Sequence, residues 1–571
     1  MDYNNQLQAD QQKFPSYQLK SEAIEVIQQR RSANYKPNIW KYDFLQSIRS
    51  KYDGEEYKRR AEKLRENVKG MFVEAVEELA KLELIDMIRK LGLGDLFAEE
   101  TQKALQAVAS SKNRKNGEEA EEDLYVTALR FRLLRLYGYE ISPDVFKAFS
   151  DEMGVFSVSK CTEIKGLLEL FEASYLGFEG ENILDEAKAF STETLRSVYS
   201  TLDTYLAKQV AHALELSTHW RVQWFDVKWH ITLYENNKNI DKILLELAKL
   251  NFNTVQATLH KDLSEISRWW RNLGLMEHLN FTRDRLAESF LCAVGLAYEP
   301  KYSCFRKCLT KITTMILVLD DVYDIYGSLE ELEQFTDAVD RWDSSKIQQL
   351  PECMKICFQA LYDSTDEIAD DIQELNGWNV QALLHLRKAW SGFCKAQFVE
   401  AKWYNEGYTP SLQEYLSNAL ISSGGIVISV HSMLSVGDDV AEDMVDFLGK
   451  NQDLVCNISI ITRLCNDLAT SVAEKERGDA PSSILCYMRE VNVSEEKAQE
   501  HIKDTITNTR KKINGQCFRT QSPSLQSFVK VTINLARMAN CIYQFGDGFG
   551  IQDQETRRHI LSLLIEPFKL E

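Results

Sequence analysis

Residues 315–324 read MILVLDDVYD, an apolar run followed at once by three aspartates. On a helix, Asp320 and Asp324 are four residues apart and Asp321 and Asp324 three, so the carboxylates share one face. Carboxylates this close repel one another unless a cation neutralises them, and oxygen ligands without histidine or cysteine suit Mg²⁺ or Mn²⁺. A solvated acidic helix end is the alternative, and this stretch alone does not decide between the two.

The sequence around this stretch favours an all-α fold with long helices. Only 9 prolines and 25 glycines occur in 571 residues, below the usual share of about 5% and 7%. Tight turns are therefore few, which disfavours sandwiches, barrels and doubly wound α/β folds. Apolar residues recur at helical spacing over 82–91, 129–136 and 167–175, and NILDEAKAF at 182–190 is typical of a helix start.

The length of the chain indicates more than one core, and NNKN at 236–239 interrupts the helical pattern. We predict a mobile, Gln-rich tail over residues 1–29, an N-terminal helical domain over 30–235 and a C-terminal metal-binding domain over 236–571. The charged segment 112–122 is predicted to be a surface loop. A second acidic stretch, DDVAE at 438–442, follows Gly437 and is predicted only to cap a helix.

Charge and composition exclude several classes of function. The net charge is −19, from 67 basic and 86 acidic residues, which disfavours a nucleic-acid partner. No run approaches the roughly 18 apolar residues of a membrane span. The 12 cysteines contain no CxxC pair and the 9 histidines form no evident ligand set, so metals bound by nitrogen or sulfur are not expected. Free buried thiols are expected instead.

The tail favours a cytoplasmic location. It contains acids, unlike a plastid transit peptide, and lacks the apolar stretch of a secretory signal. The chain opens with Met1, and Arg30 follows too closely to leave room for a usual transit peptide. The plastid stroma is the alternative, if a transit peptide has been removed.

A second set of oxygen ligands lies in RLCNDLATSVAE at 463–474. Asn466, Thr470 and Glu474 follow one another at intervals of four, so on a helix they form one stripe about 12 Å long. An amide, a hydroxyl and a carboxylate chelate a divalent cation while adding little negative charge. If this stripe faces the aspartates across a helical bundle, the cleft between them suits a diphosphate.

Arginines near both motifs supply the positive charge that such an anion requires. Arg463 lies three residues before Asn466, and Arg283 and Arg285 lie in TRDR at 282–285. Each arginine alone is more often part of a surface salt bridge. As a set, they are predicted to contact the diphosphate.

These motifs resemble those of plant terpene synthases of the class I, two-domain helical kind. DDVYD is similar to the aspartate-rich motif of that family, the stripe at 466–474 to its second metal motif, and RDR at 283–285 to its RxR element. RRSANYKPNIW at 30–40 matches the RRx8W tag of the group with most angiosperm monoterpene synthases. Within that group the likeness is closest to the acyclic branch of α-farnesene and ocimene synthases. It is carried by residues 30–41, 176–189 and 478–492.

The resemblance implies an N-terminal α-barrel without its own active site and a C-terminal α-bundle that holds the cleft. It implies that Mg²⁺ or Mn²⁺, about three ions per site, assists ionisation of an allylic diphosphate in a monomer or weak homodimer. Arg30 and Arg31 are expected to fold the N-terminal segment over the cleft. Tyr543 and Asp547, in YQFGD, match a region where the family places proton-handling groups; a structural pair is the alternative.

Departures from the family pattern indicate an acyclic product. Many cyclising relatives have Trp where this chain has Cys292 and Lys where it has Ser482, and isoprene synthases have phenylalanines where it has Thr313 and Thr462. Cys292, Thr313 and Thr462 are expected to widen the pocket, whereas Ser482 is expected to weaken one contact with the diphosphate. The expected reaction is therefore conversion of farnesyl diphosphate to α-farnesene. The alternatives are an acyclic monoterpene synthase acting on geranyl diphosphate (ocimene, linalool or myrcene), a cyclic monoterpene synthase and an isoprene synthase.

Two other classes of protein are less consistent with these residues. A chain-elongating prenyltransferase usually carries two DDxxD motifs, whereas the second motif here is NDLATSVAE. A non-catalytic helical scaffold is disfavoured by the complete set of six ligands. The N-terminal half contains no DxDD, so cyclisation initiated by protonation is not expected.

Overall fold

The computed structural model describes residues 30–111, 123–237, 240–376, 381–436, 452–477, 481–520, 525–550, 552 and 554–570. The predicted tail (1–29), the predicted surface loop (112–122) and the acidic stretch 438–442 lie outside these residues. Within the described ranges the regular structure is helical, apart from one isolated bridge between Ser150 and Phe156. The all-α prediction is confirmed.

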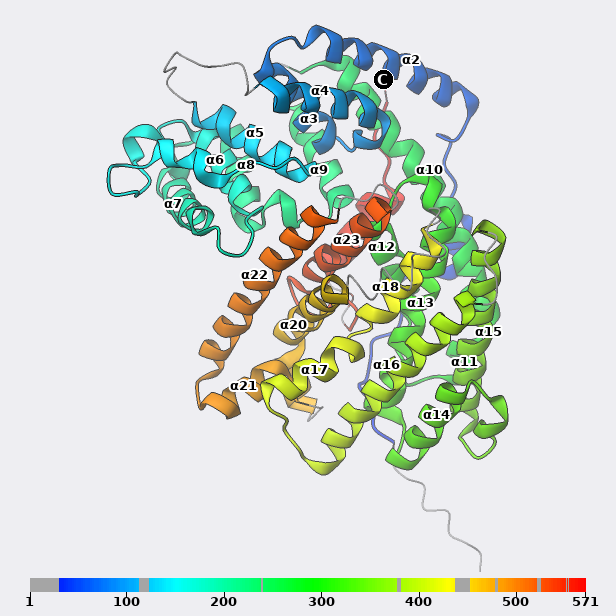
Figure 1. Cartoon of the computed structure of the whole chain (residues 1–571). Helices are drawn as coiled ribbons and strands as arrows, with labels where there is room; N and C mark the ends of the chain where they lie inside the picture. The colour runs from blue at the N-terminus through cyan, green and yellow to red at the C-terminus, as the bar shows by residue number, and fades with distance from the viewer. Residues whose placement is uncertain are drawn as a thin grey trace, which may run out of the picture.

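The N-terminal half forms a group of packed helices on one side of the molecule (Figure 1). The periodic stripes predicted from the sequence are buried: Leu82 and Ile85 have no exposed surface, and the helix predicted to start at Asn182 does start there. The helices of this half are α2 (Glu55–Glu74), α3 (Glu78–Lys90), α4 (Ala98–Ser111), α5 (Leu124–Leu136), α6 (Ile164–Ser174), α7 (Asn182–Val198), α8 (Thr204–Glu215) and α9 (Gln223–Glu235).

The C-terminal half is a bundle of longer helices (Figure 1). Its first members are α10 (Lys242–Leu273), α11 (Leu275–His278), α12 (Leu286–Leu296), α13 (Ser303–Asp321), α14 (Leu329–Arg341), α15 (Glu352–Asn376), α16 (Gln381–Glu406), α17 (Leu412–Ser422) and α18 (Gly425–Ser435). The later members are α20 (Gln452–Arg477), α21 (Ser483–Val491), α22 (Glu495–Arg519), α23 (Gln526–Tyr543) and α24 (Gln554–Ile560). Helix α1 (Tyr42–Ser47) belongs to the N-terminal segment but packs on α10.

The two halves share one hydrophobic core where α9 leads into α10. Trp224 of α9 stacks on Phe252 of α10, with ring centroids 5.1 Å apart, and on Tyr298, at 4.2 Å. Helix α9 ends at Glu235 and α10 begins at Lys242, on either side of the boundary that the sequence predicts near residue 236. None of the 12 cysteines, all of which lie in the described ranges, forms a disulfide bond.

Residues Leu412–Ser435 form the one described stretch that is long and apolar enough to cross a membrane by length and composition. In the fold this stretch is two helices, α17 and α18, separated at Gly424, which adopts a left-handed φ of 74°. A Cβ atom on Gly425 would lie 2.9 Å from the Cα of Ser459, so glycine allows α18 to approach α20 closely. Half of the stretch is buried, as is typical of a core helix.

Candidate active site

The aspartate motif lies where α13 changes into a π-helical turn. Helix α13 ends at Asp321, and Val322–Tyr326 form the turn, closed by a 2.9 Å hydrogen bond from the Gly327 amide to the Val322 carbonyl. The spacing of the three aspartates predicted one regular α-helix, so the wider π-helical turn differs from that prediction. Single π turns are frequent at functional sites, and this one places Asp324 on a wider turn than Asp320 and Asp321.

Arg283 binds two of the three aspartates. Its backbone N–H donates to Asp321 Oδ2 at 2.8 Å and its Nε to Asp321 Oδ1 at 3.1 Å, while Nη2 donates to Asp320. Gln397 of α16 donates to the other oxygen of Asp320 at 2.9 Å. Burial raises the pKa of Asp321 to about 6, against the opposing effect of Arg283. The positive charge next to the aspartate motif is therefore the guanidinium group of Arg283, which lies against two of the predicted metal ligands.

The burial of Asp321 has a consequence for stability. Clustered carboxylates alone would make Asp321→Ala nearly neutral for folding, but Asp321 is completely buried and is a partner of buried Arg283. Removing it leaves that guanidinium with only Asp320. We expect Asp321→Ala to lower the free energy of unfolding by about 3 kcal/mol, measured by urea denaturation. A denaturation midpoint equal to that of the wild type would contradict this pairing.

The second wall of the site is α20, which carries Asn466, Thr470 and Glu474 at intervals of four. Thr470 is buried and donates to the Asn466 carbonyl at 2.9 Å, which leaves its hydroxyl oxygen able to accept a cation. Between them, buried Asp467 accepts from the Tyr415 hydroxyl at 3.0 Å and from the Ser483 amide at 2.9 Å. These bonds fix how α20 is rotated, a role that the sequence did not predict.

Arg463 and Glu400 connect this wall to the first. Nη2 of Arg463 donates to Ser422 Oγ at 3.0 Å and lies 3.6 Å from Glu400 Oε1. Glu400, on α16, also lines the same pocket as Asp324. Burial alone would lower the pKa of Arg463, but Glu400 raises it well above its usual value. Arg463 is thus a permanent positive charge one helical turn from Asn466.

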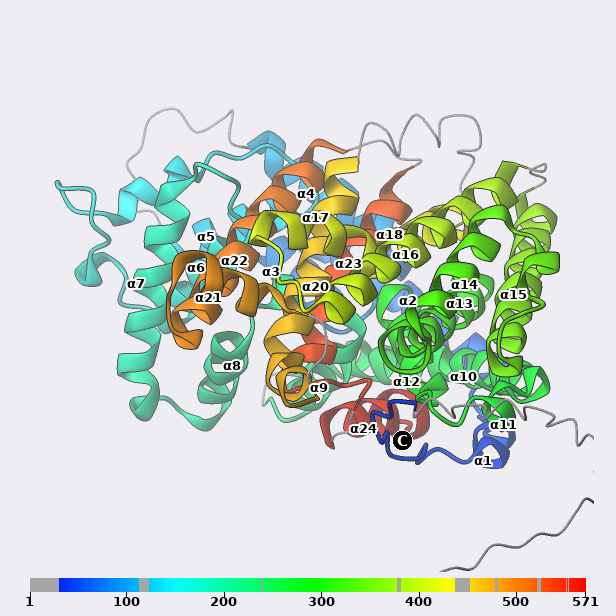
Figure 2. The same ribbon diagram turned by 90° about the horizontal axis from the view of Figure 1, so that it is seen from below.

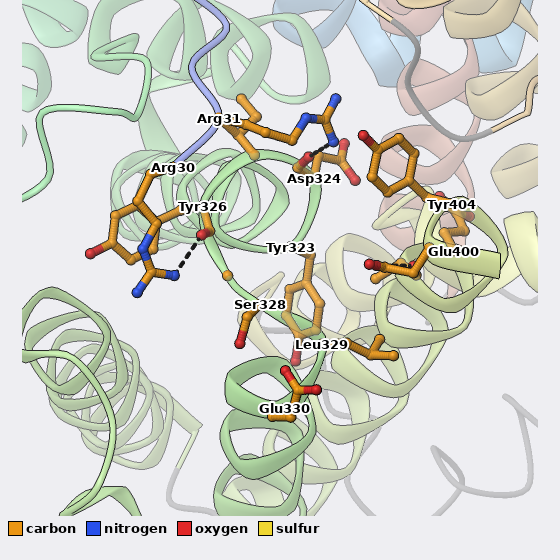
Figure 3. Close-up of a pocket in the computed structure, with 14 residues that line it drawn as sticks. Arg30, Arg31, Tyr323, Asp324, Tyr326, Ser328, Leu329, Glu330, Glu400 and Tyr404 are labelled. Carbon is orange, nitrogen blue, oxygen red and sulfur yellow. Dashed lines mark hydrogen bonds between the residues drawn. The ribbon is translucent and has the colours of Figure 1, made fainter. Parts of the chain in front are cut away.

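The pocket beside Asp324 has a volume of about 360 Å³, and Arg30 and Arg31 lie at its mouth (Figure 3). Arg31 donates to the Asp324 carbonyl at 2.9 Å and stacks over the ring of Tyr404 at 4.3 Å. Arg30 donates to the Tyr326 carbonyl at 3.0 Å and pairs with both oxygens of Glu331, at 2.5 and 2.8 Å. Both arginines therefore attach the N-terminal segment to the end of the aspartate motif.

We call this segment, residues 30–42, the N-terminal strap. It runs along the edge of the bundle that lies lowest in Figure 2. The ring of Tyr35 lies 5.0 Å from the Arg283 guanidinium. Tyr42 donates to Asp284 at 2.5 Å, and the Trp40 indole donates to Glu288 at 3.1 Å. The strap thus packs on the RDR element itself, which the sequence did not reveal.

Arg285 forms hydrogen bonds with two segments that are distant in the sequence. It is completely buried, and its guanidinium donates to the backbone carbonyls of Phe549 (2.8 Å), Gly550 (3.3 Å) and Lys36 (3.1 Å). Arg285 thus joins the strap to the C-terminal loop, and its predicted contact with the diphosphate stays a prediction.

Tyr543 and Asp547 lie at the end of α23 and in the loop that follows. Asp547 accepts from the Phe549 amide at 3.0 Å, which shapes the loop that Arg285 holds. Burial raises the pKa of Tyr543, so its phenol stays protonated at neutral pH. Their predicted role in proton handling stays a prediction.

Three of the four residues that depart from the family pattern form local hydrogen bonds through their hydroxyl groups. The hydroxyls of Thr313 and Thr462 donate to carbonyls one turn earlier, at 2.9 and 3.0 Å, which leaves small apolar methyl groups. Cys292 is buried on α12. Ser482 caps α21 through a 3.4 Å bond from the Leu485 amide. None of these residues belongs to the metal-ligand set.

Opening the strap should let water reach the reaction. We expect Arg30→Ala to retain most of the diphosphate release. The share of alcohol products should rise about fivefold, because the variant loses about 1 kcal/mol of the free energy that holds the strap closed. Gas chromatography of alcohols against hydrocarbons measures this ratio. Arg49→Ala, which removes an exposed arginine bonded only to nearby carbonyls, is the control. An unchanged ratio in Arg30→Ala would exclude a sealing role.

Comparisons with known proteins agree with this site. The family described as "Terpene synthase family, metal binding domain" matches residues 271–512, and "Terpene synthase, N-terminal domain" matches residues 39–214. The chain is 58% identical over 557 residues to an α-farnesene synthase of Ricinus communis, covering 97% of this chain and 98% of the relative. It is 56% identical over 576 residues to an (E,E)-α-farnesene synthase of Malus domestica, covering 99% and 100%.

A solved structure is also similar across nearly the whole chain. Isoprene synthase from grey poplar leaves (Populus x canescens), in complex with three Mg²⁺ ions and dimethylallyl-S-thiolodiphosphate, superposes with a TM-score of 0.85 at 41% identity. The match covers 94% of this chain and 100% of that one. The chain belongs to the terpene synthase family and is an enzyme of that family, as its motifs predicted.

Proposed function

We propose that the protein converts farnesyl diphosphate to α-farnesene, with formation of ocimene from geranyl diphosphate as a second activity. The observation that carries the proposal is the pair of α-farnesene synthases that are 58% and 56% identical to the chain over almost its entire length. Two walls of oxygen ligands with an arginine beside each provide the diphosphate site that this reaction requires.

Mg²⁺ is the proposed cofactor, with Mn²⁺ as a substitute. The donor set fits a hard divalent cation because it consists of carboxylate, amide and hydroxyl oxygens. When bound, the ions neutralise the negative charge that develops on the departing diphosphate. The residues that would hold them are Asp320, Asp321, Asp324, Asn466, Thr470 and Glu474.

The chain's own residues bind the leaving group and exclude water. Arg463 is held charged by Glu400, and Arg283 is held at the opposite wall by Asp320 and Asp321. Each wall therefore carries a guanidinium group that would contact the diphosphate. The strap, attached through Arg30 and Arg31, shields an allylic cation from solvent.

An acyclic product follows from the small side chains deeper in the bundle. Cyclisation needs a tight wall that folds the cation back on itself, and Cys292 gives less contact there than an indole would. Thr313 and Thr462 leave room for a C15 chain. An extended cation that loses a proton directly gives a linear polyene.

Gas chromatography of products from C5, C10 and C15 allylic diphosphates, each offered separately with Mg²⁺, tests the proposal. We expect α-farnesene to dominate from the C15 substrate and ocimene from the C10 substrate. A trace dominated by cyclic products such as limonene would overturn the acyclic assignment. A C10 turnover far above the C15 turnover at equal concentration would overturn the substrate assignment.

We further propose that the protein is a monomer or weak homodimer and that it is located in the cytoplasm. The acidic, Gln-rich composition of residues 1–29 supports the location. Sedimentation velocity and imaging of a fluorescent fusion to the C-terminus test the two statements.

A further inference from the structure

Away from the cleft, α8 and α9 bring two histidines and an aspartate together. His212 lies on α8, and Asp226 and His230 lie four residues apart on α9. His212 Nε2 is 2.7 Å from Asp226 Oδ1, and His230 Nε2 is 3.1 Å from Asp226 Oδ2. One ligand atom from each residue lies within 4.8 Å of the other two. Spacing along the chain does not indicate this set, because His212 and Asp226 belong to different helices.

The contact between Asp226 and His230 joins two buried atoms. Asp226 Oδ2 and His230 Nε2 form an ion pair at 3.1 Å, without the geometry of a well-aligned hydrogen bond. Two ligands bound to one metal at about 2.0–2.2 Å, with angles near 90–110°, lie roughly 3.0–3.5 Å apart. The distance between these atoms fits an edge of such a coordination shell.

The burial and packing of the two rings suit metal binding as well. Burial lowers the pKa of His230, and the opposing effect of Asp226 does not cancel this shift. Trp229 stacks on the His212 ring, with centroids 3.7 Å apart and planes at 7°, and so restricts its rotation.

Both histidines face a small pocket of about 80 Å³, which has room for a water ligand. The charged side chains at this pocket are Lys90, Arg132, Glu169 and Glu172. The two cations are already paired: Lys90 lies 2.6 Å from Asp86, and Arg132 donates to Asp86 and Glu169 at 2.8 and 2.7 Å. Their charge is therefore compensated, and they do not exclude a cation from the three ligands.

We propose that His212, Asp226 and His230 form a second metal site, for a late first-row divalent cation such as Zn²⁺. Two imidazoles and one carboxylate suit Zn²⁺, whereas Mg²⁺ prefers an all-oxygen set. The pocket leaves a coordination position for water. Because the ligands come from α8 and α9, and α9 leads into α10, the bound metal would cross-link the N-terminal half next to the catalytic bundle.

Zinc binding to the full chain tests this site. Protein freed of metal with a chelator, then exchanged into buffer with saturating Mg²⁺, is titrated with Zn²⁺ in a calorimeter. We expect about one equivalent to bind and the melting temperature to rise. His230→Phe and Asp226→Asn should lose that equivalent. His501→Phe, which removes a histidine stacked on Tyr487 of α21, should keep it and controls for the loss of a histidine outside the proposed site.

A spectroscopic measurement covers the case in which the variants fail to fold. Co²⁺ added to the wild-type protein should give the visible absorption bands of a four-coordinate site, and Zn²⁺ should abolish them. Absence of these bands, or equal Zn²⁺ binding by the wild type and a folded His230→Phe protein, would overturn the proposal. Neither readout depends on terpene formation, so the test is independent of the proposed function.

Discussion

Replacing Glu474 with glutamine is expected to lower the turnover of farnesyl diphosphate by roughly 10²–10³-fold. Glutamine keeps the size of the side chain but removes the only carboxylate of the α20 stripe. Glu474 is half-buried, and the rotation of α20 is fixed by Asp467 instead, so the melting temperature should barely change. Steady-state kinetics at saturating Mg²⁺ and thermal melts followed by circular dichroism measure the two effects.

Glu500→Gln is the matched control, since Glu500 is exposed on α22. It should leave both turnover and melting temperature at the wild-type values. Wild-type turnover in a folded Glu474→Gln protein would remove Glu474 from the ligand set. Unfolding of that variant would show that the carboxylate is structural.

The double variant Thr313→Phe, Thr462→Phe is expected to shift substrate preference from C15 toward C10 and C5. The two threonines lie on α13 and α20, and both of these helices pack against α18. Each ring would fill space that the methyl group of threonine leaves open, and overpacking by a longer chain is costly. We expect the ratio of kcat/KM for C15 over C10 to fall roughly 10-fold or more, which corresponds to about 1.4 kcal/mol.

Competition between equimolar farnesyl and geranyl diphosphate measures this ratio directly. Thr507→Phe, on the exposed side of α22, is the control and should leave it unchanged. A folded double variant with the wild-type ratio would show that these positions do not limit the length of the substrate.

Local pattern explains which parts of the fold the sequence predicts. The buried stripe through Leu82 and Ile85 and the helix start at Asn182 depend on spacing along one helix, and both are correct. The π turn after Asp321 is not predictable in this way, because its residues fit an α-helix equally well and the difference lies in backbone hydrogen bonds.

The same distinction between local sequence pattern and tertiary packing applies to the candidate site. Motif spacing predicts the two walls of candidate ligands, whereas the partners that hold them are set by tertiary packing. Gln397 and Glu400 belong to no motif and reach the site because α16 passes beside both walls. Arg285 sits in a matching motif, yet backbone carbonyls distant in sequence occupy its donors. Chemical type and spacing therefore predict candidate ligands, whereas the partners of an arginine depend on tertiary packing that spacing does not describe.

The most direct test of the account is release of pyrophosphate from farnesyl diphosphate by the purified full chain, with and without divalent cations. After chelation of all metal we predict no release above background, and after addition of Mg²⁺ we predict release together with formation of α-farnesene. Release that does not depend on a divalent cation, or no release in its presence, would contradict the account.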